Sequence, residues 1–205
     1  QFFYSRVYSK TAIMIRIFTL LLCILSVAQA QVNIDLKHEA SADFPYGTVH
    51  PDYEEYLKDF APMIGRCECK SVNRNAEGNF TDTIDMIWQF KYIMNGSAIQ
   101  DETWKADGRH SGSIRQFQPD SSQWVVTYFS QPGVTYTPGV WIGGKDGDDI
   151  VLKMDQTAPN GTEGISRLTF SNISASGYDW IAEWTSLDES FVHPIWKIYC
   201  KKQKE

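Results

Sequence analysis

Residues 84–105 read IDMIWQFKYIMNGSAIQDETWK, two alternating segments joined by Asn95-Gly96. In the first segment, large apolar side chains occupy every second position: Met86, Trp88, Phe90, Tyr92 and Met94. A period of two predicts a β-strand with one face directed towards a core. An Asn-Gly pair supplies the two positive φ angles of a type I′ turn. We therefore expect a tight β-hairpin here.

The turn fixes which residues of the two strands face each other. Centred on Asn95-Gly96, it gives these opposed pairs: Met94 and Ser97, Tyr92 and Ile99, Phe90 and Asp101, and Trp88 and Thr103. The aromatic face thus acquires a carboxylate, that of Asp101. A buried polar group costs free energy unless it has a partner or a ligand.

The chain after Gly65 reads as a series of strands separated by Gly, Pro, Asn and Asp turn residues. The expected strands span residues 66–74, 80–94, 97–105, 112–118, 123–130, 139–144, 149–155, 165–172, 178–185 and 194–201. So many hairpin-linked strands would leave exposed edges in an open sheet. We predict an all-β fold, an antiparallel up-and-down β-barrel of about ten strands.

A short helix is predicted before the first strand, from Pro51 to Phe60. Proline suits the first helical position, and acidic residues follow it at the positive end of the helix. The apolar residues follow helical spacing and form one face: Tyr53, Tyr56, Leu57 and Phe60. We expect this helix to cap one end of the barrel.

The N-terminal residues are typical of an exported protein. Met14 begins a short charged region, an apolar run follows, and Ala28-Gln29-Ala30 resembles a cleavage site, so residues 14–30 are predicted to be a signal peptide. Residues 1–13 would be an upstream extension, 31–47 a flexible arm, and 48–205 a single barrel domain. The expected location is secreted or periplasmic, without a stable membrane anchor after cleavage.

The net charge argues against a nucleic-acid partner. The whole chain carries −6, and removing three basic residues and no acidic ones with positions 1–30 leaves −9. An acidic surface without a basic stripe repels phosphate backbones.

Three cysteines follow the predicted signal peptide: Cys67, Cys69 and Cys200. The first and last strands of a barrel are neighbours, so one bridge between them is possible, and export permits disulfides. Cys69 and Cys200 are the candidate pair, although the sequence does not fix which cysteines pair. Two alternatives stay open. The three could be partly buried thiols, or Cys67-Glu68-Cys69 could bind a metal with a histidine, although no second ligand pair has zinc spacing.

From Gly65 onwards the chain resembles a family of uncharacterised bacterial lipocalin-like (calycin-type) β-barrel domains. The resemblance is carried by the short helix before Gly65, Trp88, Asn95-Gly96, Ala98-Ile99-Gln100-Asp101, Gly112-Ser113-Ile114-Arg115-Gln116-Phe117, Trp124, Thr169-Phe170, Ile173, Trp180 and Glu183-Trp184. One difference is Gly65-Arg66-Cys67, where the related barrels place a tryptophan two residues after the glycine. The resemblance implies a barrel with an internal cavity and carries no established activity.

The candidate site is the inner face of the hairpin. A pocket with aromatic walls and few polar groups suits an apolar molecule with a polar head. We expect Trp88, Phe90, Tyr92 and Ile99 to form the wall. Asp101 would supply the polar contact, together with Arg115, which shares the parity of Phe117. The expected partner is a small apolar molecule.

Two other functions remain open. The protein could be an enzyme acting on a hydrophobic molecule with Asp101 as general base, since a desolvated carboxylate has a raised pKa. It could also be a structural or interaction barrel with a filled interior, in which Asp101 and Arg115 only hold the core together. The sequence contains no recognised catalytic, metal or cofactor motif, so no metal and no cofactor are expected. The oligomeric state is left open.

Overall fold

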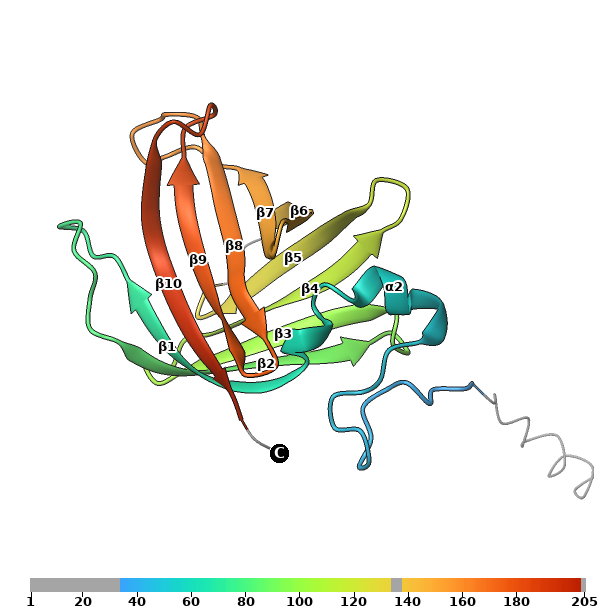
Figure 1. Cartoon of the computed structure of the whole chain (residues 1–205). Coiled ribbons are helices and arrows are strands. Elements are labelled where there is room, and N and C mark those ends of the chain that lie inside the picture. The colour runs from blue at the N-terminus through green and yellow to red at the C-terminus, as the bar shows by residue number, and fades with distance from the viewer. Residues whose placement is uncertain (1–33, 134–137, 204–205) are drawn as a thin grey trace, which may run out of the picture. The chain divides into compact units, whose positions relative to one another are not determined.

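Ten antiparallel strands close into one barrel in the part of the chain that this computed structural model describes, residues 34–133 and 138–203. The ring runs β1-β10-β9-β8-β7-β6-β5-β4-β3-β2, so neighbours in sequence are neighbours in the barrel (Figure 1). The strands are β1 (Gly65–Asn73), β2 (Ile84–Ile93), β3 (Ala98–Lys105), β4 (His110–Gln118), β5 (Gln123–Gln131), β6 (Val140–Asp146), β7 (Asp149–Asp155), β8 (Ile165–Ser174), β9 (Gly177–Thr185) and β10 (Val192–Lys202). The predicted fold class is confirmed.

The predicted upstream extension and signal peptide lie outside the described residues. None of the helices within the described ranges is long and apolar enough to span a membrane.

The β2–β3 hairpin has the predicted register. Tyr92 pairs with Ile99, Phe90 with Asp101 and Trp88 with Thr103. The turn itself differs from the prediction. Met94, Asn95 and Gly96 all have positive φ, so regular pairing stops at Ile93 and Ala98, and the Met94 side chain is 52% exposed rather than inward. Three successive left-handed residues make a longer turn than the two-residue type I′.

The helical segment is more broken than predicted. It consists of a 3₁₀ turn η1 (Pro51–Tyr53), one turn of α-helix α2 (Glu54–Leu57) and a second 3₁₀ turn η2 (Ala61–Met63). Leu57, Phe60 and Met63 are buried in the barrel, whereas Tyr53 and Tyr56 are exposed. The segment lies at the end of the barrel where β2 and β4 finish (Figure 1). We call this the plugged end, and the opposite end, where β1 and β3 finish, the far end.

Two residues before the helical segment are hydrogen-bonded to the β2–β3 turn: His38, from the predicted arm, and His50, from the start of the predicted barrel domain. The His38 amide donates to Asn95 Oδ1 (3.1 Å), and the His50 amide donates to the Gly96 carbonyl (3.0 Å). A Cβ at Gly96 would lie 2.5 Å from the His50 nitrogen, so this approach requires glycine. The flexibility of residues 31–47 stays a prediction. The two hydrogen bonds place His38 and His50 against the turn.

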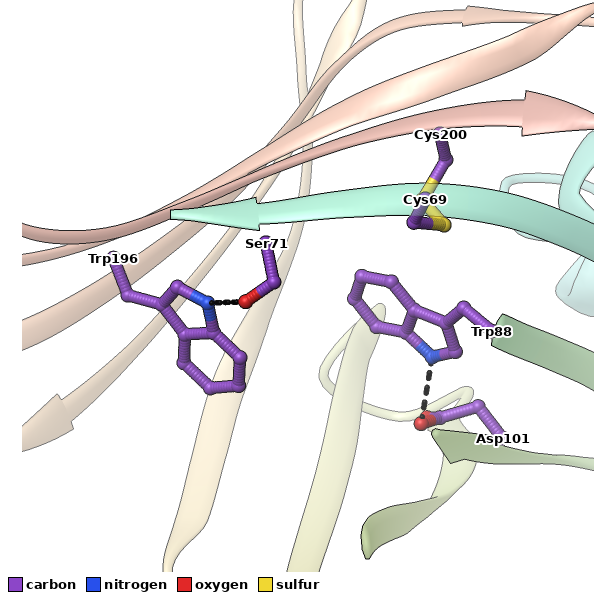
Figure 2. The surroundings of a disulfide bond; sticks show 6 residues. All are labelled: Cys69, Ser71, Trp88, Asp101, Trp196 and Cys200. Carbon is purple, nitrogen blue, oxygen red and sulfur yellow. Dashed lines mark hydrogen bonds between the residues drawn. A yellow bond between two sulfur atoms is a disulfide. The ribbon is translucent and has the colours of Figure 1, made fainter. Parts of the chain in front are cut away.

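A disulfide joins Cys69 to Cys200, which are directly opposed on β1 and β10 (Figure 2). This leaves Cys67 as a buried free thiol. In the described part of the chain, no group of three or more His, Cys, Asp or Glu side chains could hold a metal ion.

Removing the bridge is expected to destabilise the barrel. The bridged cysteines are 131 residues apart, and closing so long a loop contributes about 4 to 5 kcal/mol in the chain-entropy model. We expect the variant Cys69→Ala/Cys200→Ala to unfold at lower urea concentration than the oxidised protein, and reductant to leave the variant unchanged. Cys67→Ala is the control, and its unfolding should still respond to reductant. Equal free energies of unfolding with and without the bridge would contradict this expectation.

Candidate functional site

The interior of the barrel is filled with aromatic side chains near the plugged end. The Phe60 ring from the helical segment lies 4.7 Å from Trp124 and 5.5 Å from Phe170 between ring centroids, and it stacks on Phe90 at 6.4 Å. All four side chains are fully buried. We call this region the packed half. Its four rings pack against one another out of contact with solvent.

The other half of the interior contains a cavity of about 200 Å³. Four indoles and a phenol line it: Trp88, Trp141, Trp180, Trp196 and Tyr128. The remaining apolar lining is Val126, Leu168, Ala182 and Ile198, and the polar lining is Asp101, Thr103, Ser111, Ser113, Arg115 and Ser166. Five of the six polar residues lie on the neighbouring strands β3 and β4, and Ser166 lies on β8. The cavity therefore combines aromatic walls with a polar region on β3 and β4.

Hydrogen bonds fix three of the four indoles. The Trp88 Nε1–H donates to Asp101 Oδ1 (3.0 Å) and the Trp196 Nε1–H to Ser71 Oγ (2.8 Å), as Figure 2 shows. The Trp141 Nε1–H donates to Ser166 Oγ (3.2 Å). Rings that are already ordered lose little conformational entropy on binding, so the wall is preorganised for a ligand.

Asp101, Ser113 and Arg115 form a buried polar cluster at the boundary with the packed half. Arg115 Nη1 forms an ion pair with Asp101 Oδ2 and donates to Ser113 Oγ (3.0 Å), and Ser113 Oγ donates to the same Asp101 oxygen (2.5 Å). Both side chains of the ion pair are almost fully buried, at 3% and 4% exposure. Each charge thus has a direct counter-charge inside the barrel.

Aromatic rings surround the Arg115 guanidinium on its other side. Its central carbon lies 4.8 Å from the centroid of Phe90, 5.0 Å from Phe60 and 5.6 Å from Phe170. Burial lowers the pKa of Arg115 to about 9, so the side chain is still charged at neutral pH. The faces of these rings attract a cation, and Asp101 neutralises it. Arg115 Nε has no hydrogen-bond partner among the described residues.

The structure separates the six predicted site residues into two groups. Trp88, Asp101 and Arg115 line the cavity, whereas Phe90, Tyr92 and Ile99 are buried without reaching it. All six side chains face inwards, as predicted. The alternation along a strand does not show, however, how far along the barrel each residue lies. Two residues along a strand advance about 7 Å, so Phe90 lies closer to the plugged end than Trp88 and contacts Phe60.

Several cavity residues were not predicted as site residues. Trp180 and Trp196 belong to alternating runs on β9 and β10, Tyr178–Trp184 and Trp196–Cys200, and Trp141 comes from β6. The alternating runs mark inward faces, and that signal was available in the sequence. It does not reveal which inward residues of different strands lie at the same depth.

The contacts of Asp101 show how well it could act as the general base of an enzyme, the alternative function considered above. Both of its oxygens already accept hydrogen bonds, and its partners are an indole N–H, a hydroxyl and a guanidinium. All three donors stabilise the ionised carboxylate, and a general base that is held in its ionised form by an ion pair is a weak one. This arrangement does not favour catalysis by Asp101.

Two other buried groups are unsuited to nucleophilic chemistry. Burial raises the pKa of the Cys67 thiol and raises that of the Tyr178 phenol well above its usual value. Both groups are therefore uncharged at neutral pH, and a thiol in this state is a poor nucleophile.

The fold and cavity define a closed ten-stranded antiparallel barrel with a half-filled interior. Neither a protein-family model nor a curated protein sequence matches the chain. Twelve chains of solved structures do match it. One is the crystal structure of Rv2717c from M. tuberculosis, with a TM-score of 0.52 and 11% sequence identity over 76% of this chain and 99% of that one. At this identity the similarity shows the fold alone.

Breaking the buried ion pair is expected to destabilise the protein strongly. Arg115→Met leaves the Asp101 carboxylate buried without its counter-charge, which costs about 3 to 5 kcal/mol in comparable pairs. The double variant Asp101→Asn/Arg115→Met removes both charges, so its loss should be smaller than the sum of the two single losses. Urea unfolding of the four proteins measures this coupling. Additive losses would show that the two charges do not stabilise each other.

Proposed function

We propose that the protein is a lipocalin-like binding protein that holds one small, mostly apolar, aromatic molecule in the cavity of its barrel. The observation that carries this proposal is the cavity of about 200 Å³ walled by indoles, three of which have their N–H groups engaged by the protein. Aromatic rings prefer edge-to-face or offset contact with other rings. Such a wall therefore favours a flat ligand.

The size of the cavity limits the ligand. Pockets for drug-sized molecules usually measure about 300 to 1,000 Å³, so this cavity of about 200 Å³ is small. An apolar cavity of about 150 Å³ in another protein binds benzene. The expected ligand therefore has one or two rings and lacks a long chain buried in the same space.

The polar region of the cavity supplies the contact for a polar head. Thr103 and Ser111 share a hydrogen bond of 2.6 Å between their hydroxyls, and Ser113 contacts both charges of the buried pair. A hydroxyl can donate once and accept twice. These side chains thus keep capacity for a ligand hydroxyl or carbonyl without unpairing Asp101 and Arg115.

Membership of the lipocalin-like family and export belong to the same proposal. The family is supported by the residues that the chain shares with it and by the closed barrel. Export is supported by the signal-like residues 14–30 and by the Cys69–Cys200 bridge, because disulfides persist mainly in oxidising compartments. The proposal includes no nucleic-acid partner and no membrane anchor after cleavage.

Filling the cavity is expected to abolish ligand binding. Ala182 borders the cavity, and Ala182→Phe would occupy the space of a ring. We expect isothermal titration with naphthol, an uncharged aromatic probe, to show binding to the wild type and at least about tenfold weaker binding, or about 1.4 kcal/mol, to this variant. The matched control is Ala76→Phe, the same change at an exposed loop position.

Two results would contradict the proposed function. One is the absence of naphthol binding to the wild type together with no small molecule retained by protein purified from its source, as judged by native mass spectrometry. The other is equal binding by the wild type and a folded Ala182→Phe variant.

A further inference from the structure

Lys105 is a buried cation at the far end of the barrel. It is the last residue of β3 and shares the inward parity of Asp101 and Thr103. Its side chain is only 6% exposed. A lysine this deeply buried is rare unless its ammonium group is paired.

The partners of Lys105 within the described residues are weak. Its Nζ lies 5.0 Å from the centroid of the Trp196 ring and 3.9 Å from Asp107 Oδ2, and it donates no hydrogen bond to any described residue. The Asp107 carboxylate is already engaged by Arg109, whose Nε donates to Asp107 Oδ2 at 2.9 Å. The ammonium therefore retains donors that the described residues leave unused.

A second cavity of about 220 Å³ lies beside this ammonium. Three basic side chains line it, those of Lys105, Arg109 and His110, and Asp107 is the acidic group close to them. The second cavity shares three lining residues with the aromatic cavity: Ser111, Tyr128 and Trp196. The two cavities therefore adjoin, with the aromatic one deeper in the barrel and the cationic one at the far end.

We propose that Lys105 binds the anionic group of an aromatic carboxylate whose ring occupies the aromatic cavity. This inference rests on the proposed function and narrows its ligand to a class. A carboxylate would accept the unused hydrogen bonds of the ammonium, and such charge-assisted bonds are among the stronger ones in proteins. The shared residue Trp196 would contact both the cation and the ring of the ligand.

The electrostatics around Lys105 support this assignment. Burial lowers the pKa of Lys105, and the positive charge of Arg109 lowers it further, while Asp107 opposes them. An anion beside the ammonium would favour its charged form and offset part of the free-energy cost of burying that charge. The site thus gains electrostatic stabilisation when an anion enters, whereas a neutral ligand provides none.

A matched pair of probes tests the anion site. Phenylbutyrate and its uncharged amide, phenylbutyramide, have the same ring and chain. We expect titration calorimetry to show at least about tenfold tighter binding of the carboxylate by the wild type, equal to about 1.4 kcal/mol. Lys105→Met should remove this preference by weakening the carboxylate alone, and Lys105→Arg should retain it. Lys201→Met removes a lysine from the exposed outer face of β10 as the control, and it should also retain the preference.

The outcomes separate this inference from the proposed function. If the wild type binds both probes equally, or if a folded Lys105→Met variant keeps the preference, the anion site is wrong. The aromatic cavity still stands in that case provided Ala182→Phe abolishes binding of both probes. If neither probe nor naphthol binds the wild type, both proposals are wrong. Should Lys105→Met fail to fold, Lys105→Gln is used in its place and judged by the same criterion: a folded Lys105→Gln variant that keeps the preference overturns the anion site.

Discussion

The barrel interior is organised around one buried cation. The guanidinium of Arg115 is almost fully removed from solvent, and an isolated charge in such a place would cost several kcal/mol. Asp101 neutralises it from the cavity side, and the rings of Phe60, Phe90 and Phe170 surround it from the packed half. The Asp101–Arg115 pair therefore lies between the packed half and the cavity. The same carboxylate also orients Trp88, so the wall of the cavity depends on the charge pair.

The packed half and the cavity together account for two predictions made from the sequence. A filled core and a ligand cavity were alternatives for the whole barrel, whereas the structure contains both at different depths. The helical segment accounts for the division, because Leu57, Phe60 and Met63 enter only one end. The far end receives no such plug from the described residues, and there the lining becomes polar and basic.

The hairpin of β2 and β3 could be predicted in detail because residues close together in the sequence determine its structure. Alternation gave the inward face of Trp88, Phe90 and Tyr92, and the position of Asn95-Gly96 gave the pairing of Phe90 with Asp101. The inward orientation of Arg115 followed from its parity with Phe117, and its burial confirms it. The depth of each residue could not be predicted, because it depends on strand tilt and on which side chains of distant strands share a level. For the same reason Trp141, Trp180 and Trp196 were not predicted to join Trp88. Lys105 was overlooked because a lysine at a strand end usually reaches solvent.

The bridge between Cys69 and Cys200 lies at the seam where the first and last strands meet. Among the described residues, this barrel of consecutive hairpins is closed by one non-local strand pairing, and the other strand pairings join neighbours in sequence. Peeling either terminal strand away from the seam would expose two unpaired edges, the usual starting point for exchange of a strand between two molecules. A covalent link across the seam keeps the two edges together even when their hydrogen bonds open. In an oxidising compartment the barrel would therefore resist such exchange, and it would lose this protection once the link is reduced.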